Sequence, residues 1–210
     1  MIGSTPDMPL SKGQNPNRPK PGSRIKVEPI RTKTAIDHIK KILRDQPRNL
    51  CLFTLGINTA FRAGELLSIR LGQVRHLQVG DALDLRQSKT RTYRLVTLNR
   101  PSIEAIHYYL RHDPQLRLAD DESYLFYSRF GEVLTVPTVT NLVKRWCQAV
   151  GLEGNYGSHT MRKTWGWWQY KRGKPVPLLM EAYGHATQKQ TLDYLCIQAE
   201  EVADLYDLEL

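Results

Sequence analysis

The segment Leu50–Thr59 constrains the fold more than any other part of the sequence, because it is apolar on most sides of a helix. A helix of this kind is stable only when other elements of the protein cover it. We therefore expect Leu50–Thr59 to be a helix in the centre of a globular core. The sequence has no apolar run of about 18 residues or more, and it predicts no membrane span. Its N-terminus lacks the apolar region of a secretory signal.

Segments with helical periodicity lie on both sides of this central helix. Thr34 is expected to cap a helix that runs to about Arg44, because isoleucines recur on one face of it. Pro101 is typical of the first turn of a helix, and Gly151 is typical of a helix end. Further helices are expected at residues 65–70, 101–110, 136–150, 158–171, 175–183 and 188–199.

One stretch alternates between apolar and polar residues, as strands with one buried face do. Residues 82–86 and 93–98 both alternate, and the polar residues 87–91 between them are typical of a turn. The sequence therefore predicts a mainly α-helical α+β fold with one small antiparallel β-sheet.

Composition divides the chain into three parts. Residues 1–33 hold six of the twelve prolines and a net charge of +5, which is typical of a disordered basic arm. Such an arm is either a ligand for a DNA backbone or a solubilising tail. Residues 34–198 form the expected globular domain. Residues 199–210 are acidic, and we expect a tail or short helix that docks on its own domain or on a neighbouring protomer.

The charge and the cysteines narrow the class of function. A net charge of +9 favours polyanionic partners, above all nucleic acid. The cysteines Cys51, Cys147 and Cys196 lie far apart, so we expect no disulfide framework or zinc site, and a reducing cytoplasm is the natural location. The sequence contains no HExxH, Asp-rich or GxxxxGK[ST] motif, and it predicts neither a metal nor another cofactor.

Two short motifs combine arginine with a second polar residue three positions away. Arg62 follows the central helix and precedes Glu65, an arrangement that also suits an ordinary helix start. His159 and Arg162 are expected on one face of a helix that Ser158 can cap. An imidazole and a guanidinium at a helix N-terminus form an anion site, although a solvated face has the same pattern.

Three further positions complete the pattern. Lys89 lies in the expected turn between the strands, where Arg91 is also basic. Gly184 and His185 precede an expected helix, and Tyr194 follows nine residues after His185. Taken alone, a tyrosine in such a helix is more often a packing residue than a nucleophile.

The order and spacing of these residues resemble the tyrosine recombinase pattern of the phage integrase family. The resemblance covers roughly residues 34–198 and is carried by "FRAGELLSIRLGQV", "SHTMRKTWG" and "YGHATQKQTLDYL". It implies a tyrosine recombinase catalytic domain that cleaves and rejoins DNA at specific sites through a 3′-phosphotyrosyl intermediate. It also implies double-stranded DNA as partner, a homodimer on each site and a tetramer at the synapse.

The resemblance assigns a role to each candidate residue. Arg62 and Arg162 hold the scissile phosphate, and Glu65 orders Arg62. Guanidinium groups suit this task because their donors form a rigid fork and stay charged at any working pH. Placed before the reaction, they stabilise negative charge as it develops on the phosphate.

The remaining roles concern proton transfer. Tyr194 is the expected nucleophile, and His159 assists movement of its proton while holding the phosphate. Lys89 protonates the leaving 5′ oxygen, and His185 donates a hydrogen bond to the phosphate. A phenol has a pKa of about 10, so it needs a nearby base and cations to react near neutral pH.

Two alternative functions are compatible with the same residues. Type IB topoisomerases have similar catalytic groups and relax supercoils without a defined site. A catalytically idle DNA-binding regulatory module would bind DNA in the same way with no role for Tyr194. Most recombinases of this family carry a separate DNA-binding domain before the catalytic one, whereas only the arm of about 33 residues precedes it here.

Overall fold

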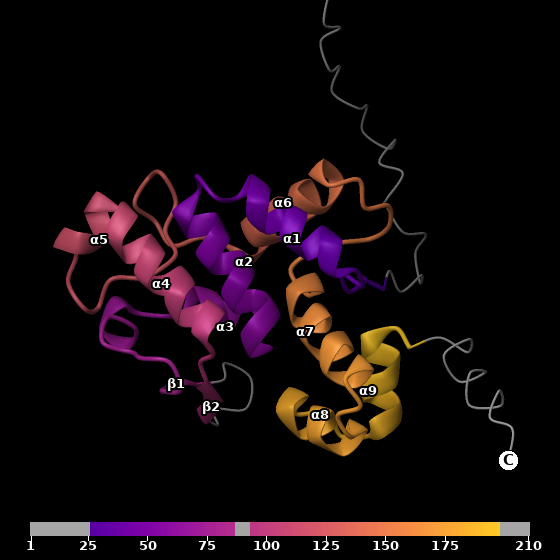
Figure 1. Ribbon diagram of the computed structural model, residues 1–210. Helices are drawn as coiled ribbons and strands as arrows, with labels where there is room; N and C mark the ends of the chain where they lie inside the picture. Colours follow the sequence, from indigo (N-terminus) through magenta and orange to yellow (C-terminus); the bar gives the residue numbers. More distant parts are fainter. Residues whose placement is uncertain (1–25, 87–92, 198–210) are drawn as a thin grey trace, which may run out of the picture.

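The computed structural model describes residues 26–86 and 93–197 of the 210-residue chain. This part is mainly helical with a two-stranded antiparallel sheet, which confirms the predicted fold class (Figure 1). Its elements are α1 (Lys33–Ile42), α2 (Pro47–Thr59), α3 (Ala63–Leu67), the 3-10 helix η1 (Leu71–Gln73), β1 (Ala82–Arg86), β2 (Tyr93–Thr97), α4 (Arg100–His112), α5 (Pro114–Leu118), α6 (Val136–Ala149), α7 (Thr160–Lys171), α8 (Val176–Tyr183) and α9 (Gln188–Leu195).

Helix α2 is the centre of the core, as its composition predicts. It packs against α4 on one side and α7 on another (Figure 1). At Gly56 the contact with α7 is so close that an added Cβ would lie 2.5 Å from the sulfur of Met161. The helix begins at Pro47 rather than Leu50, because proline is preorganised for the first turn.

The chain before α1 packs on the domain, which corrects the predicted boundary at residue 33. Ile30 is fully buried, and its backbone N–H donates to the Thr164 hydroxyl at 2.8 Å. The indole N–H of Trp168 donates to the Ile30 carbonyl at 3.1 Å. Helix α1 is capped by Thr32, not by Thr34 as predicted. Residues 1–25 of the predicted arm and the predicted tail 199–210 lie outside the described residues.

Other helix ends differ from the prediction by a few residues. Helix α3 begins directly after Arg62 rather than at Glu65, and α9 ends at Leu195 rather than near Ala199. Helix α5 was not predicted; Asp113 caps it and Pro114 opens it. In each case a local capping interaction, rather than the apolar pattern, sets the boundary.

The strands β1 and β2 form the expected hairpin. Their register pairs Ala82 with Thr97 and Arg86 with Tyr93. Leu83 and Leu85 of β1 are buried in the core, which explains the alternation in the sequence. The turn with Lys89 lies outside the described residues.

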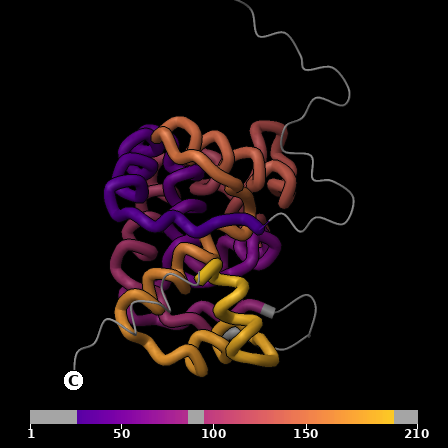
Figure 2. The backbone as a smooth tube through the Cα atoms, turned by 90° about the vertical axis from the view of Figure 1, so that its right-hand side faces the viewer, coloured from indigo at the N-terminus to yellow at the C-terminus, as the bar shows by residue number. Residues whose placement is uncertain are grey.

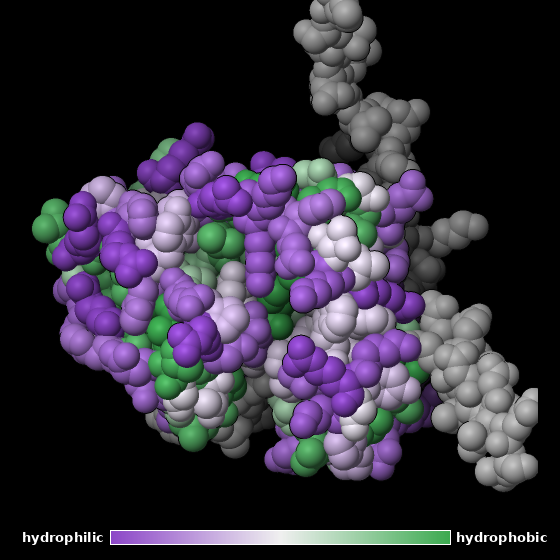
Figure 3. Space-filling model, viewed as in Figure 1, coloured by the Kyte–Doolittle hydropathy of each residue, from purple (hydrophilic) through white to green (hydrophobic). Residues whose placement is uncertain are grey.

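The C-terminal helices form a second, smaller cluster. Helices α8 and α9 fold back on α7 (Figure 1), and Ala60, Leu179, Tyr183 and Leu195 pack between them. The face in Figure 3 is mainly hydrophilic, with small separate apolar areas. Within the described ranges no helix is both long and apolar enough to cross a bilayer.

Candidate active site

Five of the six predicted catalytic residues converge between the end of α2 and helices α7 to α9. Arg62 is the N-cap of α3, and His159 and Arg162 lie at the start of α7. His185 follows α8, and Tyr194 lies in the last turn of α9. The sixth, Lys89, lies outside the described residues.

Arg162 is buried, and its guanidinium is fixed by backbone oxygens. It donates to the carbonyl of Ala60 and, at 3.0 Å, to that of Tyr183. Ala60 ends α2 in the left-handed conformation, with φ of 55°, which is uncommon for a residue with a Cβ. Burial lowers the pKa of Arg162, although a guanidinium keeps its charge in proteins. The result is a preorganised cation at the centre of the cluster.

Glu65 connects the two arginines. Its carboxylate accepts from the Arg62 side chain at 2.9 Å and from the Arg62 backbone N–H at 2.6 Å. The same carboxylate lies 3.8 Å from the Arg162 guanidinium. Because Glu65 is only 5% exposed, these contacts hold both cations in place on one side and leave them net positive.

His159 and Tyr194 form a hydrogen bond across the site. The distance from Nδ1 of His159 to the Tyr194 hydroxyl is 3.2 Å. His159 is the N-cap of α7, and the helix begins after it rather than at Ser158 as predicted. With its proton on Nε2, the imidazole accepts from the phenol through Nδ1, which is the geometry of a general base.

The environment of Tyr194 keeps its hydroxyl protonated. Burial raises the pKa of Tyr194 to about 12, while the cations Arg162 and Arg62 oppose that rise. The phenol is therefore neutral near pH 7 and reacts only when a base takes its proton. A phosphate group is a chemically suitable ligand for this site, because it can bind both arginines and lie next to the Tyr194 hydroxyl.

His185 is fixed by two contacts. Its Nδ1 lies 3.0 Å from the Thr191 hydroxyl, and its ring stacks on Tyr183 with centroids 5.0 Å apart. Burial, followed by the charges of Arg162 and Arg62, lowers the pKa of His185. With Nδ1 occupied by Thr191, Nε2 is the ring nitrogen that can serve a ligand.

Sequence reasoning missed the residues that support the cluster. Tyr183 donates from its hydroxyl to the Arg162 carbonyl at 2.8 Å, and its ring lies 4.7 Å below the same guanidinium. Position 166 has room only for glycine, because an added Cβ would lie 1.9 Å from the Tyr183 hydroxyl. The one signal for Tyr183 is its place immediately before Gly184 and His185.

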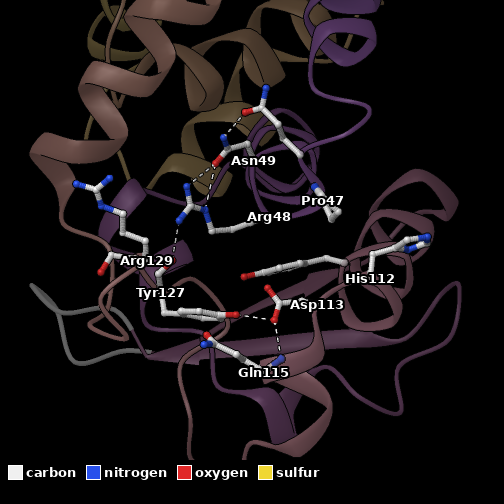
Figure 4. A pocket seen from close by; sticks show the side chains of 11 residues that line it. Pro47, Arg48, Asn49, His112, Asp113, Gln115, Tyr127 and Arg129 are labelled. Carbon is white, nitrogen blue, oxygen red and sulfur yellow. Dashed lines mark hydrogen bonds between the residues drawn. The ribbon is translucent and has the colours of Figure 1, made fainter.

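A separate cavity of about 440 Å³ lies at the other end of α2, where Pro47, Arg48 and Asn49 form the first turn (Figure 4). The Tyr127 hydroxyl donates to Asp113 at 2.5 Å along its wall. Among the predicted site residues that the structure describes, none lines this cavity. The five predicted catalytic residues lie at the opposite end of α2, where Arg162 donates to the carbonyl of Ala60.

The chain is similar to known integrases and recombinases. The phage integrase family model matches residues 30–201. The probable integrase/recombinase YoeC of Bacillus subtilis is 29% identical over 182 residues, covering 86% of this chain and 95% of that protein. The tyrosine recombinase XerC of Caldanaerobacter subterraneus is 30% identical over 166 residues, covering 76% of this chain but 45% of that protein.

Solved structures of recombinases have the same fold. The crystal structure of XerA recombinase superposes with a TM-score of 0.71 and 17% identity, covering 88% of this chain and 65% of that one. The XerH site-specific recombinase bound to palindromic difH superposes with a TM-score of 0.67 and 21% identity. That match covers 89% of this chain and 55% of the XerH chain, so the shared fold is only part of the longer protein.

Proposed function

Because the chain belongs to the phage integrase family, we propose that it is a site-specific DNA recombinase that cleaves and rejoins strands through a covalent bond to Tyr194. One observation carries the assignment of the nucleophile. The Tyr194 hydroxyl lies 3.2 Å from Nδ1 of His159. The positive charges of Arg162 and Arg62 act on the same hydroxyl and oppose the rise of its pKa. A phenol paired with a base and beside cations is activated for attack on phosphorus.

In the proposed first step, the Tyr194 oxygen attacks the scissile phosphorus and its proton passes to His159. The bond from phosphorus to the 5′ oxygen breaks, leaving a 3′-phosphotyrosyl link. Arg62 and Arg162 stabilise the charge that develops on the non-bridging oxygens. The negative charge of the phosphate favours the protonated form of His185, which donates a hydrogen bond to it through Nε2.

The leaving 5′ oxygen needs a proton, and we assign its donor to Lys89 from the sequence pattern. In the second step, the 5′ hydroxyl of another strand attacks the phosphotyrosyl phosphorus and passes its proton to Lys89. The bond from phosphorus to the Tyr194 oxygen breaks, and His159 returns the proton to Tyr194. One phosphate ester replaces another in both steps, so rejoining requires no external energy source.

Double-stranded DNA is the proposed partner, and three observations support it. The net charge of +9 favours a polyanion. The cluster places two guanidiniums, two imidazoles and a phenol together, which suits a phosphodiester. The similar XerH structure is described as bound to its difH substrate. We also propose a homodimer on each site, a tetramer at the synapse, and a cytoplasmic location.

The experiment uses DNA fragments from the locus that encodes the protein, each with a nick beside a candidate cleavage point. The short fragment diffuses away after cleavage and traps the covalent complex, which a denaturing gel separates. Wild-type protein is expected to give a slow, protease-sensitive band that Tyr194→Phe lacks. Tyr108→Phe is the matched control, since it removes one exposed hydroxyl that donates to the Arg44 carbonyl.

The outcomes separate the alternatives. A covalent band that persists in Tyr194→Phe rejects the proposed nucleophile. Salt-sensitive DNA binding with no band in any protein supports an idle regulatory module. Covalent capture without sequence preference, together with relaxation of supercoiled plasmid, supports a type IB topoisomerase activity.

A further inference from the structure

Cys196, directly after α9, is contacted by two other parts of the chain, the segment before α1 and helix α7. It follows α9 in the left-handed conformation, with φ of 58°. Its carbonyl accepts from the Arg31 guanidinium at 2.9 Å, and its thiol lies 3.5 Å from the Val27 carbonyl. The ammonium of Lys163 donates to its sulfur at 3.3 Å. The segment before α1 crosses close to the end of α9 in Figure 2.

Lys163 also contacts the nucleophile directly. Its Nζ lies 4.8 Å from the centroid of the Tyr194 ring, in the range of a cation–π interaction. The side chain is buried, with 5% of the residue exposed, and it comes immediately after Arg162 on α7. A lysine is rarely buried to this extent unless it is paired. Its contacts are the thiol of Cys196 on one side and the ring of Tyr194 on the other.

Helix α9 is held by its packing on α7 and α8 and by the contacts at its end. It is eight residues long, and only Thr191 and Leu195 are buried. Isolated helices of this length are not stable, so tertiary contacts determine where the helix lies. The phenol oxygen must stay within hydrogen-bond reach of His159 for proton transfer.

We propose that Lys163 is a positioning residue for Tyr194: its buried ammonium links the phenol ring to Cys196 and so sets the distance from the hydroxyl to His159. The inference rests on the proposed function, and it adds a residue to which the resemblance assigns no role. Lys163 contacts the Cys196 sulfur and the Tyr194 ring. It acts through the orientation of the nucleophile.

The test combines two measurements on Lys163→Met, which keeps an unbranched apolar side chain and removes the charge. The first places 3-fluorotyrosine at position 194 and records the fluorine NMR signal of the protein without DNA. The second measures single-turnover cleavage of the nicked DNA by the unlabelled protein. Lys171→Met is the matched control, because Lys171 lies on the same helix over the ring of Trp167 and is exposed.

We expect Lys163→Met to shift or broaden the fluorine signal and to slow cleavage by roughly 10- to 100-fold, the loss typical of a small misplacement. DNA binding should be unchanged, and Lys171→Met should behave as wild type in both measurements. Cys196→Gly keeps the left-handed backbone but removes the thiol, and it should reproduce part of the effect. Cys196→Ser, which retains a polar partner for Lys163, should lie closer to wild type.

Each contrary result has one meaning. A fluorine signal identical to wild type in Lys163→Met overturns the positioning role, whatever happens to cleavage. An altered signal with cleavage at the wild-type rate overturns it as well. A third outcome is that the wild-type protein makes no covalent complex while Lys163→Met still alters the fluorine signal. The proposed function then fails, but the contact between Lys163 and the Tyr194 ring is supported.

Discussion

The Nδ1 atom of His159 lies 3.2 Å from the hydroxyl of Tyr194, although 35 residues separate them in the sequence. The N-cap position of His159 and the last turn of α9 bring them together. Because the phenol is protonated near neutral pH, the proposed reaction depends on this contact. The first prediction tests it directly.

Replacing His159 with Gln removes the base and keeps a polar side chain at the helix start. We expect single-turnover cleavage to slow by about 10²-fold or more, the usual contribution of general base catalysis. DNA binding at low salt should change much less. His38→Gln, an exposed position on α1, is the control. Cleavage by His159→Gln at the wild-type rate would contradict the assignment.

Glu65→Gln removes the carboxylate that connects Arg62 and Arg162. Two cations then face each other with less compensation, so the free energy of unfolding should fall by up to about 3 kcal/mol. Cleavage should slow because Arg62 loses its 2.9 Å partner. Urea unfolding and the covalent-complex gel measure the two effects. Glu104→Gln on the exposed face of α4 should leave both unchanged.

Two glycine-to-alanine substitutions should have opposite effects on stability. Gly166→Ala places a methyl group 1.9 Å from the Tyr183 hydroxyl, and it should cost about 1–3 kcal/mol by overpacking. Gly64→Ala has open space around its Cβ in α3, and it should stabilise the protein by up to about 1 kcal/mol. Thermal unfolding of both variants gives the sign. Equal shifts in Tm would contradict the packing around Tyr183.

The raised pKa of Tyr194 predicts how stability depends on alkaline pH. The unfolded chain loses this proton near pH 10, whereas the folded protein keeps it to about pH 12. The stability that comes from the neutral phenol is therefore present below about pH 10 and is lost as the pH rises toward 12. Urea unfolding across this range should show a steeper decline for wild type than for Tyr194→Phe. Parallel curves would mean that burial does not raise this pKa.

The sequence predicted the parts of the fold that local patterns determine. The apolar run in α2 and the alternation in β1 and β2 led to the core and the hairpin. The order of the motif residues led to the cluster, and five of the six predicted catalytic residues meet there. The apolar run and the alternation each depend on a single element, so they can be recognised without knowledge of tertiary contacts.

The supporting contacts depend on the fold as a whole and were not predictable. The left-handed turn at Ala60 has no glycine to mark it, yet its carbonyl holds Arg162. The resemblance assigns no role to Lys163 or Cys196, and they are 33 residues apart. Ile30 lies in a proline-rich segment whose composition is typical of disorder, but its burial against α7 makes that segment part of the domain.

The contacts of the segment before α1 limit how this enzyme can be joined to other proteins. Val27 and Arg31 both contact Cys196, two positions after the proposed nucleophile. A chimera that fuses a new DNA-binding module at residue 32 or later would replace these contacts along with the linker. A fusion junction placed before Lys26 retains these contacts. Chimeras of this protein with a new DNA-binding module should therefore be joined there.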